Sequence, residues 1–118
     1  MSRALLRVAA FKAALAESSQ RRAAGDAAAA FASLRLAHVL GQRDFGPHLK
    51  VHLRMLSMAV TVRDWREVRG QVLRITLVPI GHLLARLPRG NTGAANVSAF
   101  APMAIPPDIE RLLDGKEW

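Results

Sequence analysis

Residues 47–60 read PHLKVHLRMLSMAV, and this stretch decides the fold. At 100° per residue, the basic side chain of Arg54 falls on one face of a helix. His48, His52 and Met55 fall on the opposite face. A helix with an exposed basic face normally buries its other side. The spacing therefore predicts a helix, ending near residue 61, that carries two histidines and a methionine into the protein interior.

The composition favours a small all-α protein. The chain has 118 residues, of which 51% are hydrophobic, and many of these are alanine, the residue with the highest helix propensity. This length suits one domain. Cysteine is absent, which excludes disulfides, thiolate metal ligands and a cysteine nucleophile. No apolar run approaches the roughly 20 residues that span a bilayer, so we expect a cytoplasmic protein.

The segment before the histidine helix predicts two helices joined by a tight turn. The first extends over residues 2–22, with Arg7 on its solvent side. Gly25 suits the left-handed conformation that ends a helix, and Asp26 can cap the next one. This second helix continues to about residue 40, and helical spacing places His38 on its apolar face.

The segment after the histidine helix predicts a fourth main helix. Asp64 can cap a helix over residues 65–78, whose apolar stripe consists of Trp65, Val68, Val72 and Ile75. Pro79 is expected to end or kink this helix. A short helix over residues 81–87 would then carry His82.

The C-terminal part is expected to cross the helices as an irregular strap. Residues 88–107 are rich in glycine, asparagine, serine and proline, a composition typical of loops. A last short helix is expected to run to Leu113. The sequence thus predicts one domain over residues 1–118, with four main helices over 1–78 and the short helix, polar strap and C-terminal helix over 79–118.

The two capping aspartates suggest a repeated helical pair. Asp26 and Asp64 are 38 residues apart, near the period of tetratricopeptide repeats. The consensus residues of that repeat are mostly missing. We therefore expect two stacked helical hairpins with tetratricopeptide-like architecture, closed by the strap.

Five motifs occur in order along the chain: AHVLGQR (37–43), PHLKVHLRML (47–56), DWREVRGQ (64–71), PIGHL (79–83) and GNTGAANVSAF (90–100). Together they resemble a small bacterial family of helical proteins known as a domain of unknown function. This resemblance implies a cytoplasmic bacterial protein, sometimes encoded near metal-resistance genes, with no established activity. The motif positions that carry chemistry are occupied by His38, His48, His52, His82, Asn91 and Asn96.

The four histidines are candidate metal ligands. His48 and His52, four residues apart on one helical face, have a standard chelating geometry. His38 would come from the neighbouring helix and His82 from the next element. Such imidazoles suit zinc, copper or iron, and Met55 would suit Cu(I).

A structural role explains the same histidines. Buried neutral imidazoles can hydrogen-bond to backbone carbonyls and polar side chains. His38, His48 and His52 would then tie the loop that contains Asn91, Asn96 and Ser98 onto the helices. Ser98 beside a histidine is also conceivable as a catalytic pair, although no motif supports it. Trp65 could line a peptide-binding groove.

The sequence favours a non-enzymatic adaptor with a protein or peptide partner, linked to metal stress. The first alternative is a protein that binds a transition metal through its histidines, and the second is an enzyme with a histidine general base. The net charge of +8 leaves nucleic acid open as a partner. The arginines are scattered without a dense basic run, so nucleic-acid binding is not expected.

Overall fold

The computed structural model describes residues 2–84 and 87–113, and within them the chain forms five α-helices and no β-strand. The all-α fold expected from the composition is confirmed. The helices are α1 (Arg3–Ala23), α2 (Ala27–Gly41), α3 (Phe45–Val62), α4 (Trp65–Leu83) and α5 (Pro107–Glu110).

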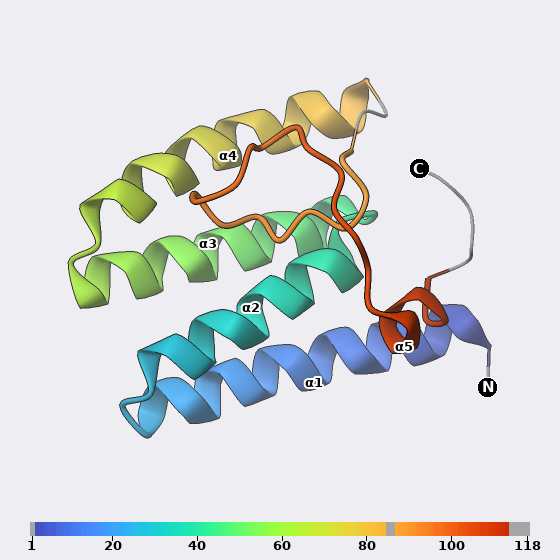
Figure 1. Cartoon of the computed structure of the whole chain (residues 1–118), viewed down its shortest axis with the longest axis horizontal. Helices are drawn as coiled ribbons and strands as arrows, with labels where there is room; N and C mark the ends of the chain where they lie inside the picture. Colours follow the sequence, from blue (N-terminus) through green and yellow to red (C-terminus); the bar gives the residue numbers. More distant parts are fainter. Residues whose placement is uncertain (1, 85–86, 114–118) are drawn as a thin grey trace.

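The four long helices form two antiparallel hairpins, α1 with α2 and α3 with α4 (Figure 1). The hairpins meet where α2 packs along α3. The segment after α4 runs back across α3 and α4 before it reaches α5, which lies beside the start of α1 (Figure 1). The arrangement agrees with the two stacked hairpins expected from the sequence, while the relation to tetratricopeptide repeats stays a prediction.

Local capping determines where the helices begin. The side chains of Ser2, Asp26 and Asp64 each accept a hydrogen bond from the backbone N–H three residues later, as capping residues do. Between α1 and α2, Gly25 has a φ of +80°, a conformation that glycine adopts without strain. These signals explain why the first two helices lie within a residue or two of their predicted bounds.

The hydrophobic core lies among the first three helices. Its buried members are Phe11, Ala14, Leu15, Leu34, Ala37, Leu40, Val51 and Met55. No residue of α4 belongs to this cluster of described residues. The side of α3 that faces α4 is therefore free to carry polar groups, and the histidines occupy it.

Arg7 is buried, although the sequence suggested that it would reach solvent. Its side chain is 8% exposed, and its Nη1 atom donates to the carbonyl of Leu40 at 3.1 Å and to Asp44 at 3.0 Å. A buried guanidinium is tolerated when its charge and its N–H groups have partners. Helical periodicity alone could not show that Asp44 would supply the countercharge.

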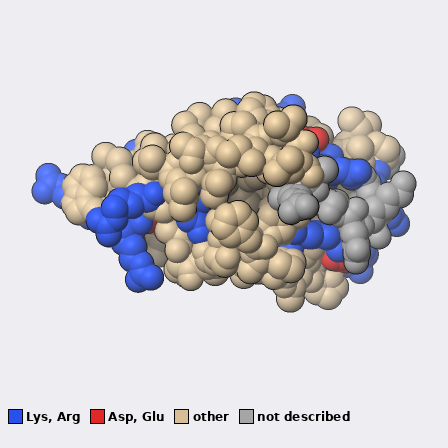
Figure 2. All heavy atoms as spheres, turned by 90° about the horizontal axis from the view of Figure 1, so that it is seen from above, with Lys and Arg blue, Asp and Glu red and all other residues tan. Residues whose placement is uncertain are grey.

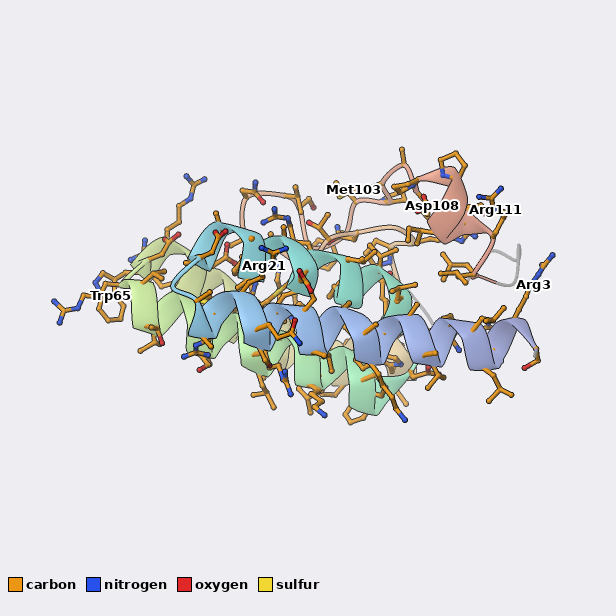
Figure 3. The ribbon with its side chains drawn as sticks, turned by 90° about the horizontal axis from the view of Figure 1, so that it is seen from below. Arg3, Arg21, Trp65, Met103, Asp108 and Arg111 are labelled. Carbon is orange, nitrogen blue, oxygen red and sulfur yellow. The ribbon has the colours of Figure 1, made fainter. Side chains whose placement is uncertain are left out.

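The expected inner stripe of α4 is buried only in part, because Val68 and Ile75 are half-buried whereas its other two residues are exposed. Trp65 is 55% exposed and lies at one end of the molecule, and Val72 is 50% exposed (Figure 3). The buried face of α4 instead carries Gln71, Arg74 and Val78. The helix is therefore rotated about its own axis relative to the orientation expected from the sequence. We ascribe this to the segments that α4 covers, because the histidines and the strap carry polar groups that need hydrogen-bond partners.

Three expected helix bounds are also corrected. Pro79 lies inside α4, which continues to Leu83, so the separate helix predicted over residues 81–87 is the end of α4; residues 85–86 lie outside the described range. We ascribe the continuation of the helix past Pro79 to contacts on both sides of the proline: Val78 is buried in the interior, and His82 is hydrogen-bonded to His48. The histidine helix begins at Phe45, and α5 ends before Leu113.

One buried asparagine organises the strap. Asn91 Nδ2 donates to the carbonyls of Ser98 and Ala101 at 2.7 and 2.8 Å. Its Oδ1 atom accepts from the backbone N–H of Gly93 at 2.8 Å. The side chain thus substitutes for the regular hydrogen bonds that an irregular segment lacks.

The outer side of α4 is largely uncharged. Figure 2 views the molecule from this side and shows lysine and arginine side chains mainly toward its ends. Exposed apolar residues on α4 include Val72, Leu73, Ile80 and Leu83. Within the described ranges, none of the helices is both long and apolar enough to cross a membrane.

Candidate metal centre

Two helices bring three histidines together in the interior. His38 lies near the end of α2, and His48 and His52 lie one turn apart on α3. Each of the three side chains is at most 5% exposed. The packing of α2 along α3 places the ring of His38 against those of His48 and His52. The sequence alone could only suggest this contact.

The three rings converge through the same atom. The Nε2 atoms of His38 and His48 are 3.0 Å apart, those of His38 and His52 are 3.1 Å apart, and those of His48 and His52 are 3.2 Å apart. Among the described residues, this triad is the one group of three or more histidine or acidic side chains whose ligand atoms lie close enough together to hold a metal ion.

The second ring nitrogen of His38, Nδ1, is hydrogen-bonded to the strap. Its Nδ1 lies 2.6 Å from the backbone carbonyl of Asn91. A carbonyl only accepts hydrogen bonds, so Nδ1 carries the proton and Nε2 of the neutral ring presents a lone pair.

The outer nitrogen of His52 is held by α4. Its Nδ1 lies 2.7 Å from Gln71 Oε1. The orientation of this amide is determined because Gln71 Nε2 donates to Glu67 at 2.7 Å and to the carbonyl of Gly93 at 2.9 Å. His52 Nδ1 therefore donates, and its Nε2 atom also presents a lone pair to the centre.

His82 lies behind His48 rather than in the triad. His48 Nδ1 and His82 Nε2 are 2.9 Å apart. One of these nitrogens donates to the other, so the pair has two tautomeric arrangements. If His82 donates, His48 Nε2 carries a proton that the lone pairs of His38 and His52 accept. If His48 donates, all three Nε2 atoms present lone pairs to the same point.

Burial keeps the rings uncharged near neutral pH. Burial, with the neighbouring rings adding to it, lowers the pKa of His48 to about 3, and burial lowers that of His52 to about 4. Burial also holds the pKa of His38 well below its usual range and lowers that of His82. Neutral imidazoles are the form that binds metal ions, because the ligand nitrogen must be free of its proton.

Acidification should destabilise the metal-free protein. An exposed histidine in the unfolded chain has a pKa near ~6.5, whereas the folded values of His48 and His52 are about 3 and 4. Between these values the unfolded state binds more protons, so stability falls as the pH falls. Each such histidine lowers the free energy of unfolding by about 1.4 kcal/mol per pH unit.

Urea denaturation in the presence of a chelator, at pH 7.5, 6.5 and 5.5, measures this dependence. The His52→Gln variant has one fewer titrating group and should show a shallower slope. A free energy of unfolding that does not change over this range would contradict the burial of neutral rings.

A cavity of about 270 Å³ adjoins the triad. All three histidines line it, together with Arg74 and Gln42 from the polar side and with apolar residues that include Leu77, Val78, Ile80, Leu84, Leu87 and Phe100. Arg74 Nε and Gln42 Oε1 are buried without a hydrogen-bond partner. The histidine cluster therefore adjoins a space whose wall is largely apolar, and Arg74 and Gln42 beside that space each carry a buried polar atom without a hydrogen-bond partner.

A comparison with known protein families matches residues 6–113 to the family described as "Protein of unknown function (DUF3703)". The chain belongs to the DUF3703 family. The resemblance inferred from the five motifs is thereby confirmed at the level of the family. No match was found among curated proteins or solved structures.

The other residues singled out in this DUF3703 sequence lie in three places. Asn91 is buried and holds the strap, with its carbonyl on His38. Asn96, Ser98 and Trp65 are exposed, so none of them lies in the histidine cluster. Met55, considered as a copper ligand, is buried in the hydrophobic core with Phe11 and Leu40.

Sequence reasoning missed the polar residues of α4 around the triad. Gln71 orients His52, Glu67 orients Gln71, and Arg74 lines the cavity. Their spacing contained a signal, because Glu67, Gln71 and Arg74 recur at intervals of four and three residues and so share one helical face. Such a polar helical face usually points to solvent, whereas this one covers a polar interior.

Proposed function

We propose that this protein binds one transition-metal ion through the Nε2 atoms of His38, His48 and His52. The observation that carries the proposal is their convergence, with separations of 3.0–3.2 Å. Nitrogen ligands on one tetrahedral zinc ion, at bonds of about 2.0–2.1 Å, are separated by roughly 3.3 Å. A shift of a few tenths of an ångström would therefore complete the site.

The outer hydrogen bonds support a metal role as well as a structural one. A histidine that binds metal usually donates its other N–H to a carbonyl or carboxylate, which determines the tautomer and the ring orientation. Asn91 and Gln71 accept these bonds from His38 and His52. The bond between His38 and Asn91 is also compatible with the structural interpretation, and the two outer bonds leave the Nε2 atoms of His38 and His52 available to a metal ion.

Zinc fits this ligand set best among zinc, copper and iron. Three histidines with one open position are a known zinc arrangement. Cu(I) favours thiolate or thioether ligands, and non-haem Fe(II) sites commonly add a carboxylate to two histidines. The triad contains neither kind of ligand. An adaptor role and an enzymatic role remain predictions of the sequence.

The site geometry also favours an open coordination position. The centre of a triangle with these sides lies about 1.8 Å from each nitrogen, less than a zinc–nitrogen bond of about 2.0–2.1 Å. His38, His48 and His52 would therefore hold a zinc ion as three protein ligands and leave one position for a further ligand.

The test is elemental analysis of untagged protein, followed by zinc titration against a chromophoric chelator. We expect one zinc per chain with a dissociation constant below ~1 μM. His52→Ala should weaken binding by at least ~100-fold, whereas His82→Ala, which removes only a partner of His48, should weaken it by ~10–100-fold at most.

Circular dichroism establishes that each variant is folded. Wild-type protein that binds no zinc, or binds it as weakly as folded His52→Ala, would contradict the proposal.

A further inference from the structure

Arg74 is a buried arginine that forms no ion pair among the described residues, although the charge of Glu67 acts on it. Its side chain is 7% exposed, and its two Nη atoms donate to the backbone carbonyls of Gly70 and Val97. Its Nε atom has no partner. Nothing in the described part of the chain forms an ion pair with it.

The other buried arginine nitrogens differ in this respect. Arg7 Nε and Arg89 Nε also lack partners, but these guanidinium groups form ion pairs with Asp44 and Glu110. Burying a charge without a partner is costly. The position of Arg74 on the cavity wall therefore calls for an anion from outside the described chain.

A metal ion would increase this need. The three imidazoles are neutral, so a bound divalent ion keeps its full charge beside the positive charge of Arg74. Glu67 Oε2 accepts hydrogen bonds from Gln71 Nε2 and from the backbone N–H of Ala95, and the single negative charge of Glu67 would face both Arg74 and the ion. An anion in the cavity that Arg74 and the triad share would neutralise both positive groups.

The rest of the cavity favours an organic anion over a bare inorganic one. Its volume is about 270 Å³, and Leu77, Ile80 and Phe100 contribute apolar surface to its wall. Small-molecule sites typically combine such a wall with a few polar groups that orient the ligand.

We propose that the cavity binds a small carboxylate, whose head group is the further ligand of the metal and is held by Arg74, while its apolar body contacts the wall. This inference rests on the proposed metal site.

The test uses protein loaded with Co²⁺, whose visible absorption reports changes in its ligands. Butyrate should change the spectrum and saturate, and acetate should bind several-fold more weakly because it lacks most of the apolar body. Neutral butyramide, and chloride at equal ionic strength, should have little effect. Chloride or butyramide acting as well as butyrate would overturn the proposed ligand class.

Arg74→Gln separates the anion site from the metal site. It should weaken butyrate binding by at least tenfold while Co²⁺ binds as tightly as in wild type or more tightly, because a repelling charge is removed. Arg69→Gln makes the same change at an exposed position of α4 and should alter neither affinity. A variant whose site was merely damaged would lose both ligands.

The outcomes distinguish the two proposals. If Co²⁺ binds one per chain and butyrate leaves its spectrum unchanged, the anion site is wrong and the metal site stands. If Arg74→Gln binds butyrate as tightly as wild type, Arg74 does not contribute to butyrate binding, and the proposed role of Arg74 is wrong. If Co²⁺ does not bind, the metal site fails and the anion site fails with it.

Discussion

Excess zinc should raise the melting temperature of the purified protein by roughly 10–25 °C. A ligand that binds only the folded state stabilises it by about 4 kcal/mol at a free concentration 1,000 times its dissociation constant. Each kcal/mol shifts the melting temperature by roughly 4–8 °C for domains of about 60–100 residues and by roughly 2–4 °C for those of about 150–250 residues, and a chain of 118 residues lies between the two. The effect is large because the triad draws its ligands from α2 and α3, which come together only on folding.

Thermal unfolding followed by circular dichroism, with and without zinc, measures this shift. Magnesium at the same concentration is the control for ionic effects, since it prefers oxygen ligands. The double variant His48→Ala/His52→Ala keeps one triad ligand and should show almost no zinc-dependent shift. An equal shift with magnesium, or in the double variant, would mean that the stabilisation does not come from the triad.

Replacing Gly93 with alanine should destabilise the protein by about 3 kcal/mol or more. Gly93 has a φ of +77°, which disfavours any residue with a side chain. An added Cβ would also lie within 2.4 Å of Cδ2 in the buried ring of His38. Because the ring of His38 would have to move, the variant should also bind zinc at least ~10-fold more weakly.

Gly25→Ala is the matched control. Gly25 has a similar φ of +80°, but an added Cβ would meet nothing within 4 Å. It should therefore cost only the backbone strain, about 1–2 kcal/mol, and leave zinc affinity unchanged. Urea denaturation without metal and zinc titration compare the two variants. Equal effects of both would indicate that Gly93 has no close contact with the histidine ring.

The histidine cluster shows which contacts helical spacing can predict and which it cannot. His48 and His52 share a face because they are four residues apart, and this holds however α3 packs. His38 joins them only because α2 lies along α3, and the choice of Nε2 over Nδ1 depends on Asn91 and Gln71. Those partners follow the histidines by 53 and 19 residues, so no local pattern could indicate them.

For α4, helical spacing did not predict which face is buried. Its sequence offers one face with Trp65 and Val72 and another with Gln71, Arg74 and Val78, and periodicity favours burying the more apolar one. The structure leaves Val68 and Ile75 of the apolar stripe half-buried and fully buries the other face, because that face supplies hydrogen bonds to His52 and to the carbonyls of Gly93 and Val97. Tertiary contacts with polar groups outweighed the apolar stripe.

The sequence by itself determined the all-α class, the capped helix starts and the shared face of two histidines. These follow from interactions within a few residues along the chain, where backbone geometry leaves little choice. Only the tertiary structure decided which face of α4 is buried, that Pro79 lies within a helix, and that three imidazole nitrogens converge beside Arg74. Those features depend on hydrogen bonds and packing between segments far apart in the chain, whose partners are not specified until the helices meet.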